Sequence, residues 1–98
     1  MRIYVHAPDD FILNPGESKY IKFTSPRIRK YKMSEKTIVI ETSPQLLEHH
    51  VVAIGGEEGV LLINHGIHPR RIEMGEVICI VKVVRLYKER KRKKKEGE

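Results

Sequence analysis

This sequence has one cysteine, no tryptophan and no long apolar run. Its single cysteine, Cys79, excludes an intrachain disulfide framework and any zinc site built from several cysteines. No apolar run approaches the roughly 20 residues that a transmembrane helix needs, and the N-terminus has no hydrophobic core of a signal peptide. These absences predict a soluble, cytoplasmic protein without a membrane span.

Amide side chains are also scarce. The chain has one Gln and two Asn among its 98 residues, whereas Lys, Glu, Arg, Ile and Val are abundant. This composition is typical of proteins from hot environments, where thermolabile amides are avoided.

Positive charge is plentiful but unevenly placed along the chain. The sequence has 19 Lys and Arg against 13 Asp and Glu, a formal net charge of +6. Residues 85–98 alone contain eight Lys and Arg against three Glu, so residues 1–84 carry a net charge of only +1. We expect one nearly neutral domain over residues 1–87 and a basic tail over residues 88–98 that is disordered or frayed.

Short runs rich in Ile and Val, separated by Pro, Gly, Asn and Asp, predict strands joined by turns. The predicted strands cover residues 2–7, 11–13, 19–24, 27–33, 37–41, 51–54, 60–64 and 77–86. The only predicted helical turn covers residues 44–50, where Ser43 caps the helix and Leu46 and Leu47 face inward. Seven or eight short strands indicate an all-β barrel or sandwich.

Residue alternation assigns faces to two of these strands. In residues 19–24, Tyr20, Lys22 and Thr24 share one face, and Ile21 and Phe23 share the other. The strand over residues 77–86 is apolar on both faces, so it is expected to be central in a sheet or covered by another subunit. Because about 84 ordered residues bury only a small core, we expect a homo-oligomer.

Three segments, in order along the chain, resemble the dUTPase-like (β-clip) family. Phe11–Lys19 resembles the family's segment of a strand, an L-x-P-G-E turn and a second strand. Val60–Gly66 resembles the family's V-x-L-x-N strand, and Ile72–Ile80 resembles its glycine turn and the strand that follows. The resemblance covers about residues 8 to 86. It implies a small β-barrel of the β-clip type that assembles as a trimer.

The segments that carry dUTPase chemistry differ here. The stretch Ala53–Gly59 lacks the Asp and the Tyr of the family's water-activating loop, and Thr42–Pro44 stands where the family has a phosphate-gripping Arg-Ser-Ser. Ile80 replaces a Gln, and the basic tail replaces a Gly-rich C-terminal arm. We therefore predict a dUTPase-like scaffold that is not an enzyme, with no catalytic residues and no cofactor.

The basic tail predicts binding to nucleic acid or another polyanion. Its cations repel one another unless phosphates neutralise them, and released counterions supply affinity that does not depend on sequence. A second basic cluster, with Tyr20 and Tyr31 interleaved, spans residues 19–36 and is suited to following a phosphate backbone. A solubilising tail and a solvated strand face are the alternatives. The predicted nucleic-acid-binding residues are Arg27, Arg29, Lys30, Lys32, Lys88, Arg90, Lys91, Arg92, Lys93, Lys94 and Lys95.

The remaining polar residues are interpreted as surface residues. Two of the five histidines, His65 and His68, have a spacing that metal ligands use, but we expect histidines at turns and no metal site. Glu57 and Glu58 are expected in an exposed acidic turn. Two other functions stay open: a deoxynucleotide-binding or hydrolysing dUTPase relative with a rebuilt site, and a structural or assembly protein of a virus or plasmid.

Overall fold

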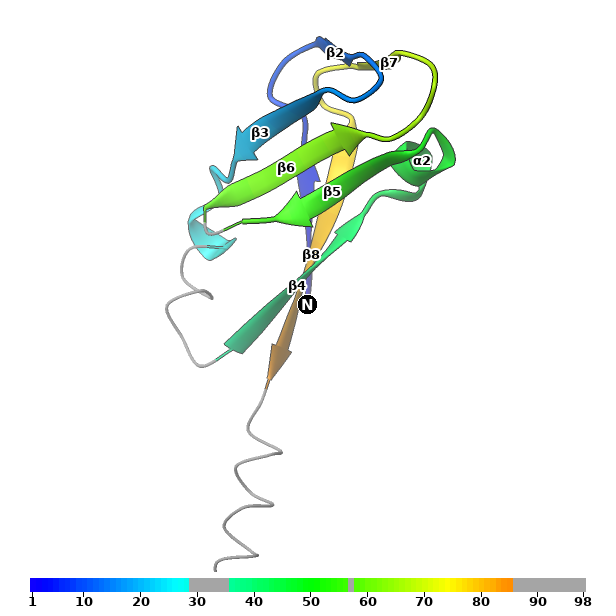
Figure 1. Ribbon diagram of the computed structural model, residues 1–98. Helices are drawn as coiled ribbons and strands as arrows, with labels where there is room; N and C mark the ends of the chain where they lie inside the picture. Colours follow the sequence, from blue (N-terminus) through cyan, green and yellow to red (C-terminus); the bar gives the residue numbers. More distant parts are fainter. Residues whose placement is uncertain (29–35, 57, 86–98) are drawn as a thin grey trace, which may run out of the picture.

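The chain folds mainly into β-strands (Figure 1). The computed structural model describes residues 1–28, 36–56 and 58–85. In chain order its elements are β1 (Arg2–His6), β2 (Phe11–Leu13), β3 (Ser18–Lys22), β4 (Lys36–Thr42), α2 (Pro44–Glu48), β5 (Val51–Gly55), β6 (Gly59–Asn64), β7 (Arg70–Ile72) and β8 (Val77–Arg85). This confirms the predicted all-β class.

The strands form three antiparallel sheets, none of which closes on itself within the described residues. Their strand orders are β1-β8-β4, β2-β7 and β3-β6-β5. In Figure 1 the two-stranded sheet lies at one end of the molecule, and β4 and β8 extend toward the other end. β8 lies between β1 and β4, which confirms the expectation that a strand with two apolar faces is central.

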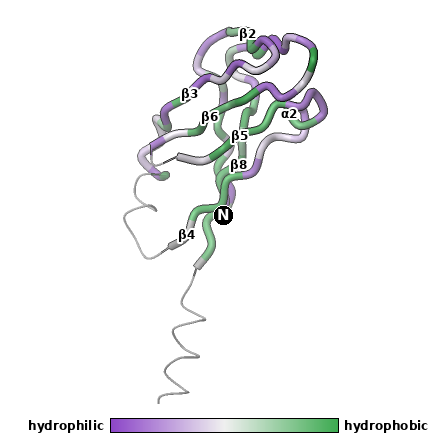
Figure 2. The backbone as a smooth tube through the Cα atoms, in the orientation of Figure 1, coloured by the Kyte–Doolittle hydropathy of each residue, from purple (hydrophilic) through white to green (hydrophobic). Residues whose placement is uncertain are grey.

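Buried side chains of both three-stranded sheets form one hydrophobic cluster. β8 contributes Ile78, Cys79 and Val81, while β6 contributes Val60 and Leu62, and all five are fully buried. Figure 2 shows the hydrophobic residues along β4 and β8. The cluster therefore joins the two sheets into one core.

The alternation predicted for β3 and the residues after it is confirmed. Ile21 and Phe23 are buried, whereas Tyr20, Lys22 and Thr24 are exposed. Because successive side chains of a strand point to opposite faces, the apolar pair faces the core and the other three face solvent.

The strand predicted over residues 27–33 is wrong in its first part. Residues 26–28 form a helical turn, and residues 29–33 lie outside the described residues. Pro26 suits this turn because its fixed φ angle matches the first helical position. Ile28 then points into the core, where it is 1% exposed.

The predicted helical turn after Ser43 is confirmed as α2. The Ser43 hydroxyl accepts a hydrogen bond from the Leu46 backbone nitrogen at 3.5 Å, and Pro44 occupies the first turn. Leu46 is buried as expected, but Leu47 is 51% exposed, because neighbouring helical residues lie about 100° apart. No helix in the described ranges is both long enough and apolar enough to cross a membrane.

Strand β7 was not expected, because its three residues include two arginines and show no apolar alternation. It pairs with β2 in the register Ile12↔Arg71. The turn between β2 and β3 matches its sequence signal, since Gly16 has a φ of +82°, a conformation that glycine adopts easily.

Candidate nucleic-acid interface

The start of β4 and the end of β8 lie side by side. Their antiparallel register pairs Lys36 with Arg85 and Thr37 with Val84. Lys36 directly follows residues 29–35 in the chain, and Arg85 directly precedes residues 86–98. The two basic segments that the sequence separates by about 50 residues are therefore attached to the same end of one sheet.

Most of the positive charge is attached to this end, which we call the basic end. Residues 27–36 contain five Lys and Arg against one Glu, and residues 85–98 contain eight against three. The rest of the chain has six Lys and Arg against nine Asp and Glu. Most of the net positive charge of the sequence therefore belongs to two segments that join the sheet at neighbouring residues.

Arg27 is the predicted binding residue whose position the structure describes in full. It is exposed, and its Nη2 atom lies 3.3 Å from the Met1 sulfur. The Met1 carbonyl accepts a hydrogen bond from the Val83 nitrogen at 3.1 Å. Arg27 is therefore held next to the chain start and the last residues of β8, at the basic end.

The other predicted binding residues lie outside the described residues. They are Arg29, Lys30, Lys32, Lys88, Arg90, Lys91, Arg92, Lys93, Lys94 and Lys95.

Away from the basic end, cations lie close to carboxylates. The Lys19 ammonium is 4.0 Å from Asp9, and the Lys22 ammonium is 3.9 Å from Glu58. These two lysines belong to the basic cluster predicted over residues 19–36. Nearby carboxylates weaken the attraction of these two lysines for phosphate.

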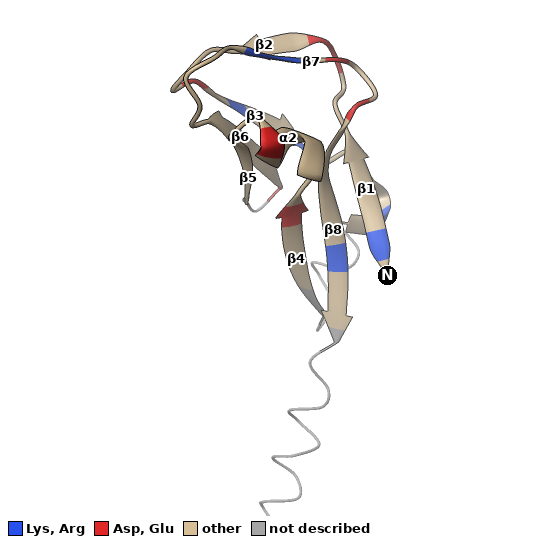
Figure 3. Ribbon diagram, turned by 90° about the vertical axis from the view of Figure 1, so that its right-hand side faces the viewer, with Lys and Arg blue, Asp and Glu red and all other residues tan. Residues whose placement is uncertain are grey.

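The same compensation holds around β7 (Figure 3). Arg71 lies 3.8 Å from both Asp10 and Glu73, and Arg70 pairs with Glu76 at 2.5 Å. Arg70 and Glu76 are both mostly buried, so this pair is positioned to hold β7 rather than to bind a ligand.

The outer face of the β1-β8-β4 sheet carries residues that sequence reasoning missed. Arg2 and Tyr4 are exposed on β1, while the alternating Ile3 is buried. Across the sheet, Arg2 is in register with Lys82, and Tyr4 is in register with Ile80. The alternation in residues 2–7 was the available signal, because it places Arg2, Tyr4 and His6 on one face.

Histidines gather around one cavity of about 350 Å³ between the end of α2 and the loop before β7. Its lining includes His49, His50, His68 and Arg70, and His50 has a φ of +62°. Within the ranges that the structure describes, no three His, Cys, Asp or Glu side chains are arranged to hold a metal ion.

Cys79 and Glu58, two further candidates for chemistry, lie in opposite surroundings. Cys79 is fully buried in β8, and burial raises the pKa of its thiol to about 11. It is therefore a neutral core residue rather than a nucleophile at neutral pH. Glu58 is exposed next to Gly59 as expected, and Glu57 lies outside the described residues.

No protein-family model matches this chain, and the search of curated proteins returned no significant relative.

Proposed function

We propose that this protein binds nucleic acid, or a polyanion of similar charge density, through its basic end and without sequence specificity. The observation that carries the proposal is the pairing of Lys36 with Arg85, which attaches both basic segments to one end of the β1-β8-β4 sheet. Two separate cationic segments that start from neighbouring residues form one footprint on a phosphate backbone. A cytoplasmic location, where nucleic acid is present, belongs to the same proposal.

Counterion release sets the expected strength of this interaction. Each phosphate that a cation neutralises contributes about −0.9 to the slope of log affinity against log salt on duplex DNA. If six tail cations contact phosphates, raising the salt concentration from 50 to 200 mM weakens binding by about 10³-fold. Such a slope distinguishes phosphate contacts from a tail that only improves solubility.

The direct test is a tail-neutralised variant of the full chain. Arg90, Lys91, Arg92, Lys93, Lys94 and Lys95 are replaced by Gln, and binding to labelled DNA is measured by fluorescence anisotropy across a salt series. We expect the magnitude of the salt slope to fall by up to about 5, which is about 0.9 for each lost phosphate contact.

A control variant tests whether the position of the cations matters. Lys19→Gln and Arg71→Gln together remove two cations that lie near carboxylates away from the basic end. This double variant should keep the slope of the parent protein. An unchanged slope in the tail-neutralised variant would refute the proposal.

We also propose that the protein has a dUTPase-like scaffold and assembles as a homotrimer. Support for association comes from the outer face of the β3-β6-β5 sheet, where Tyr20, Leu61 and Ile54 lie in one row. Tyr20 and Ile54 are 51% and 50% exposed. Several basic ends in one oligomer would raise the avidity for a long polyanion. Sedimentation with and without DNA measures the oligomer and shows whether assembly needs nucleic acid.

A further inference from the structure

We propose that the outer face of the β1-β8-β4 sheet binds unpaired bases, with Tyr4 as the stacking side chain. This inference rests on the proposed function and narrows it to single-stranded nucleic acid. It adds Tyr4 and Arg2, which lie next to the basic end, to the surface that contacts the ligand.

Tyr4 lies on an accessible part of this face. Its side chain is 52% exposed, and its register partner Ile80 is only partly buried. Farther along the same face, Val39 and Val84 are 44% and 47% exposed. A half-exposed aromatic ring with apolar neighbours on its sheet face offers a base the kind of surface on which it stacks.

Cations flank this ring on the side of the basic end. Arg2 is two residues before Tyr4, so their Cα atoms are about 7 Å apart along the strand. Lys82 is the register partner of Arg2 on β8, and its ammonium is held by Glu41 at 2.8 Å. Among the described residues, no carboxylate forms an ion pair with Arg2, whereas Lys82 is paired with Glu41.

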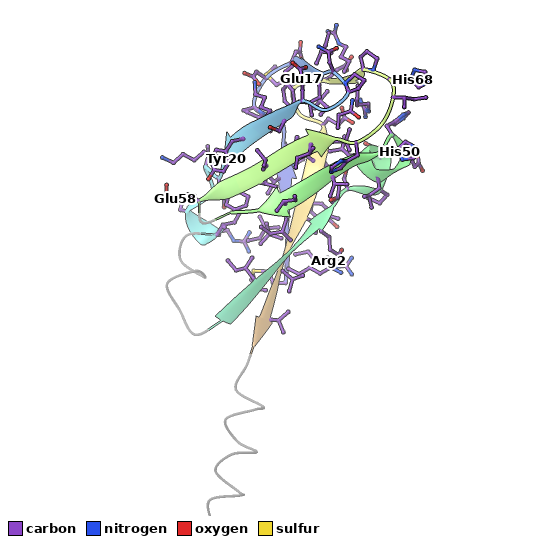
Figure 4. All side chains as sticks on the ribbon, viewed as in Figure 1. Arg2, Glu17, Tyr20, His50, Glu58 and His68 are labelled. Atoms are coloured by element: carbon purple, nitrogen blue, oxygen red, sulfur yellow. The ribbon has the colours of Figure 1, made fainter. Side chains whose placement is uncertain are left out.

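Tyr20 is equally exposed but poorly suited to the same role. Its ring lies against Gly59, where an added Cβ would be 2.7 Å from the ring's Cζ atom. One face of the ring is therefore occupied by its own sheet. The cation two residues away on the same face, Lys22, has its ammonium 3.9 Å from the Glu58 carboxylate. Figure 4 places Tyr20 near Glu58, on a different sheet from Arg2.

Stacking on a tyrosine requires a base that has left the duplex. In a double helix the bases stack on one another and expose only their edges in the grooves, whereas an unpaired base exposes its flat face. The tail cations bind both forms through phosphates. Preference for single strands must therefore come from Tyr4 and its surroundings.

The test compares three single substitutions on two ligands. Tyr4→Ala, Tyr4→Phe and Ile12→Ala are measured with a labelled oligothymidine and with a duplex of equal length at one salt concentration. We expect Tyr4→Ala to weaken single-strand binding by about 5- to 150-fold, the range that corresponds to 1–3 kcal/mol per stacked base. Tyr4→Phe keeps the ring and should bind within about two-fold of the parent. Ile12→Ala removes a side chain of similar exposure (56%) on β2, outside both proposed surfaces, and should also bind within about two-fold.

The duplex and the salt series separate this inference from the function on which it rests. Unchanged single-strand binding by Tyr4→Ala, or equal losses on both ligands, would overturn the role of Tyr4. The response to tail neutralisation would then still decide whether the basic end binds polyanions. Circular dichroism of Tyr4→Ala establishes that its loss of binding is not a loss of fold.

Discussion

Asn64 provides the sharpest test of how the loops are held on this fold. It is fully buried, and its side chain makes three hydrogen bonds. The Nδ2 group donates to the carbonyls of Leu13 and His68, both at 2.9 Å, and Oδ1 accepts from the Gly66 nitrogen at 2.8 Å. One side chain thus ties β2, β6 and the loop before β7 together.

The substitution Asn64→Leu removes all three bonds while keeping the number and branching of the side-chain heavy atoms. A typical intramolecular hydrogen bond contributes about 1 kcal/mol, and a buried group left without a partner costs at least as much. We therefore expect the free energy of unfolding to fall by about 3 kcal/mol or more. For a domain of this size, that corresponds to a decrease in Tm of about 12–24 °C.

Urea unfolding followed by circular dichroism at fixed protein concentration measures this loss. Concentration is fixed because association would add to the apparent stability. Asn14→Leu is the matched control, since Asn14 is exposed, and its stability should stay within about 0.5 kcal/mol of the parent. A loss below about 1 kcal/mol for Asn64→Leu would contradict the assignment of the three bonds.

Two further predictions concern Gly59 and Cys79. Gly59→Ala would place a Cβ against the Ile21 carbonyl oxygen, so it should lower the free energy of unfolding by at least about 2 kcal/mol. Gly56→Ala is the control, because its Cβ would make only ordinary contacts. It should change the free energy of unfolding by less than about 0.5 kcal/mol in the same urea assay. The Cys79 thiol should resist Ellman's reagent at pH 8 until the protein unfolds. Because burial raises the pKa of this thiol from 9.0 to about 11, between these pH values the thiol ionises in the unfolded chain before it ionises in the folded one. The stability of the parent relative to Cys79→Ala should therefore fall as the pH rises from 9 to 11.

The polarised charge suggests how this protein approaches a nucleic acid. Under the proposed function the basic end would attract phosphate, while the remainder of the chain, which has more acidic than basic residues, would repel it. Binding in one orientation would bring Tyr4 and Arg2 toward the strand and turn β2 and β7 away from it. Neutralising the tail should therefore affect both the rate of association and its dependence on salt.

Much of the fold was readable from local patterns. The short Ile- and Val-rich runs predicted seven of the eight described strands, and Ser43 with Pro44 predicted α2. Arg27 was misassigned to a strand because the rough alternation of its neighbours was given more weight than Pro26, whose fixed φ angle favours the first position of a helical turn. β7 was missed since its pairing with β2 depends on a partner far away in the chain.

The sequence by itself determined which segments form seven of the eight described strands, that β8 is central or covered, and that positive charge is concentrated in two stretches. Residue alternation and charge are local properties, so they are visible without knowledge of the fold. Only the tertiary structure decided that these stretches share one end, because the pairing of Lys36 with Arg85 joins residues 49 positions apart. It also decided that Tyr4 lies beside Arg2 and Lys82 on one open sheet face while the Tyr20 ring covers Gly59. Strand order and register depend on how the whole core packs, and no short stretch of sequence contains that information.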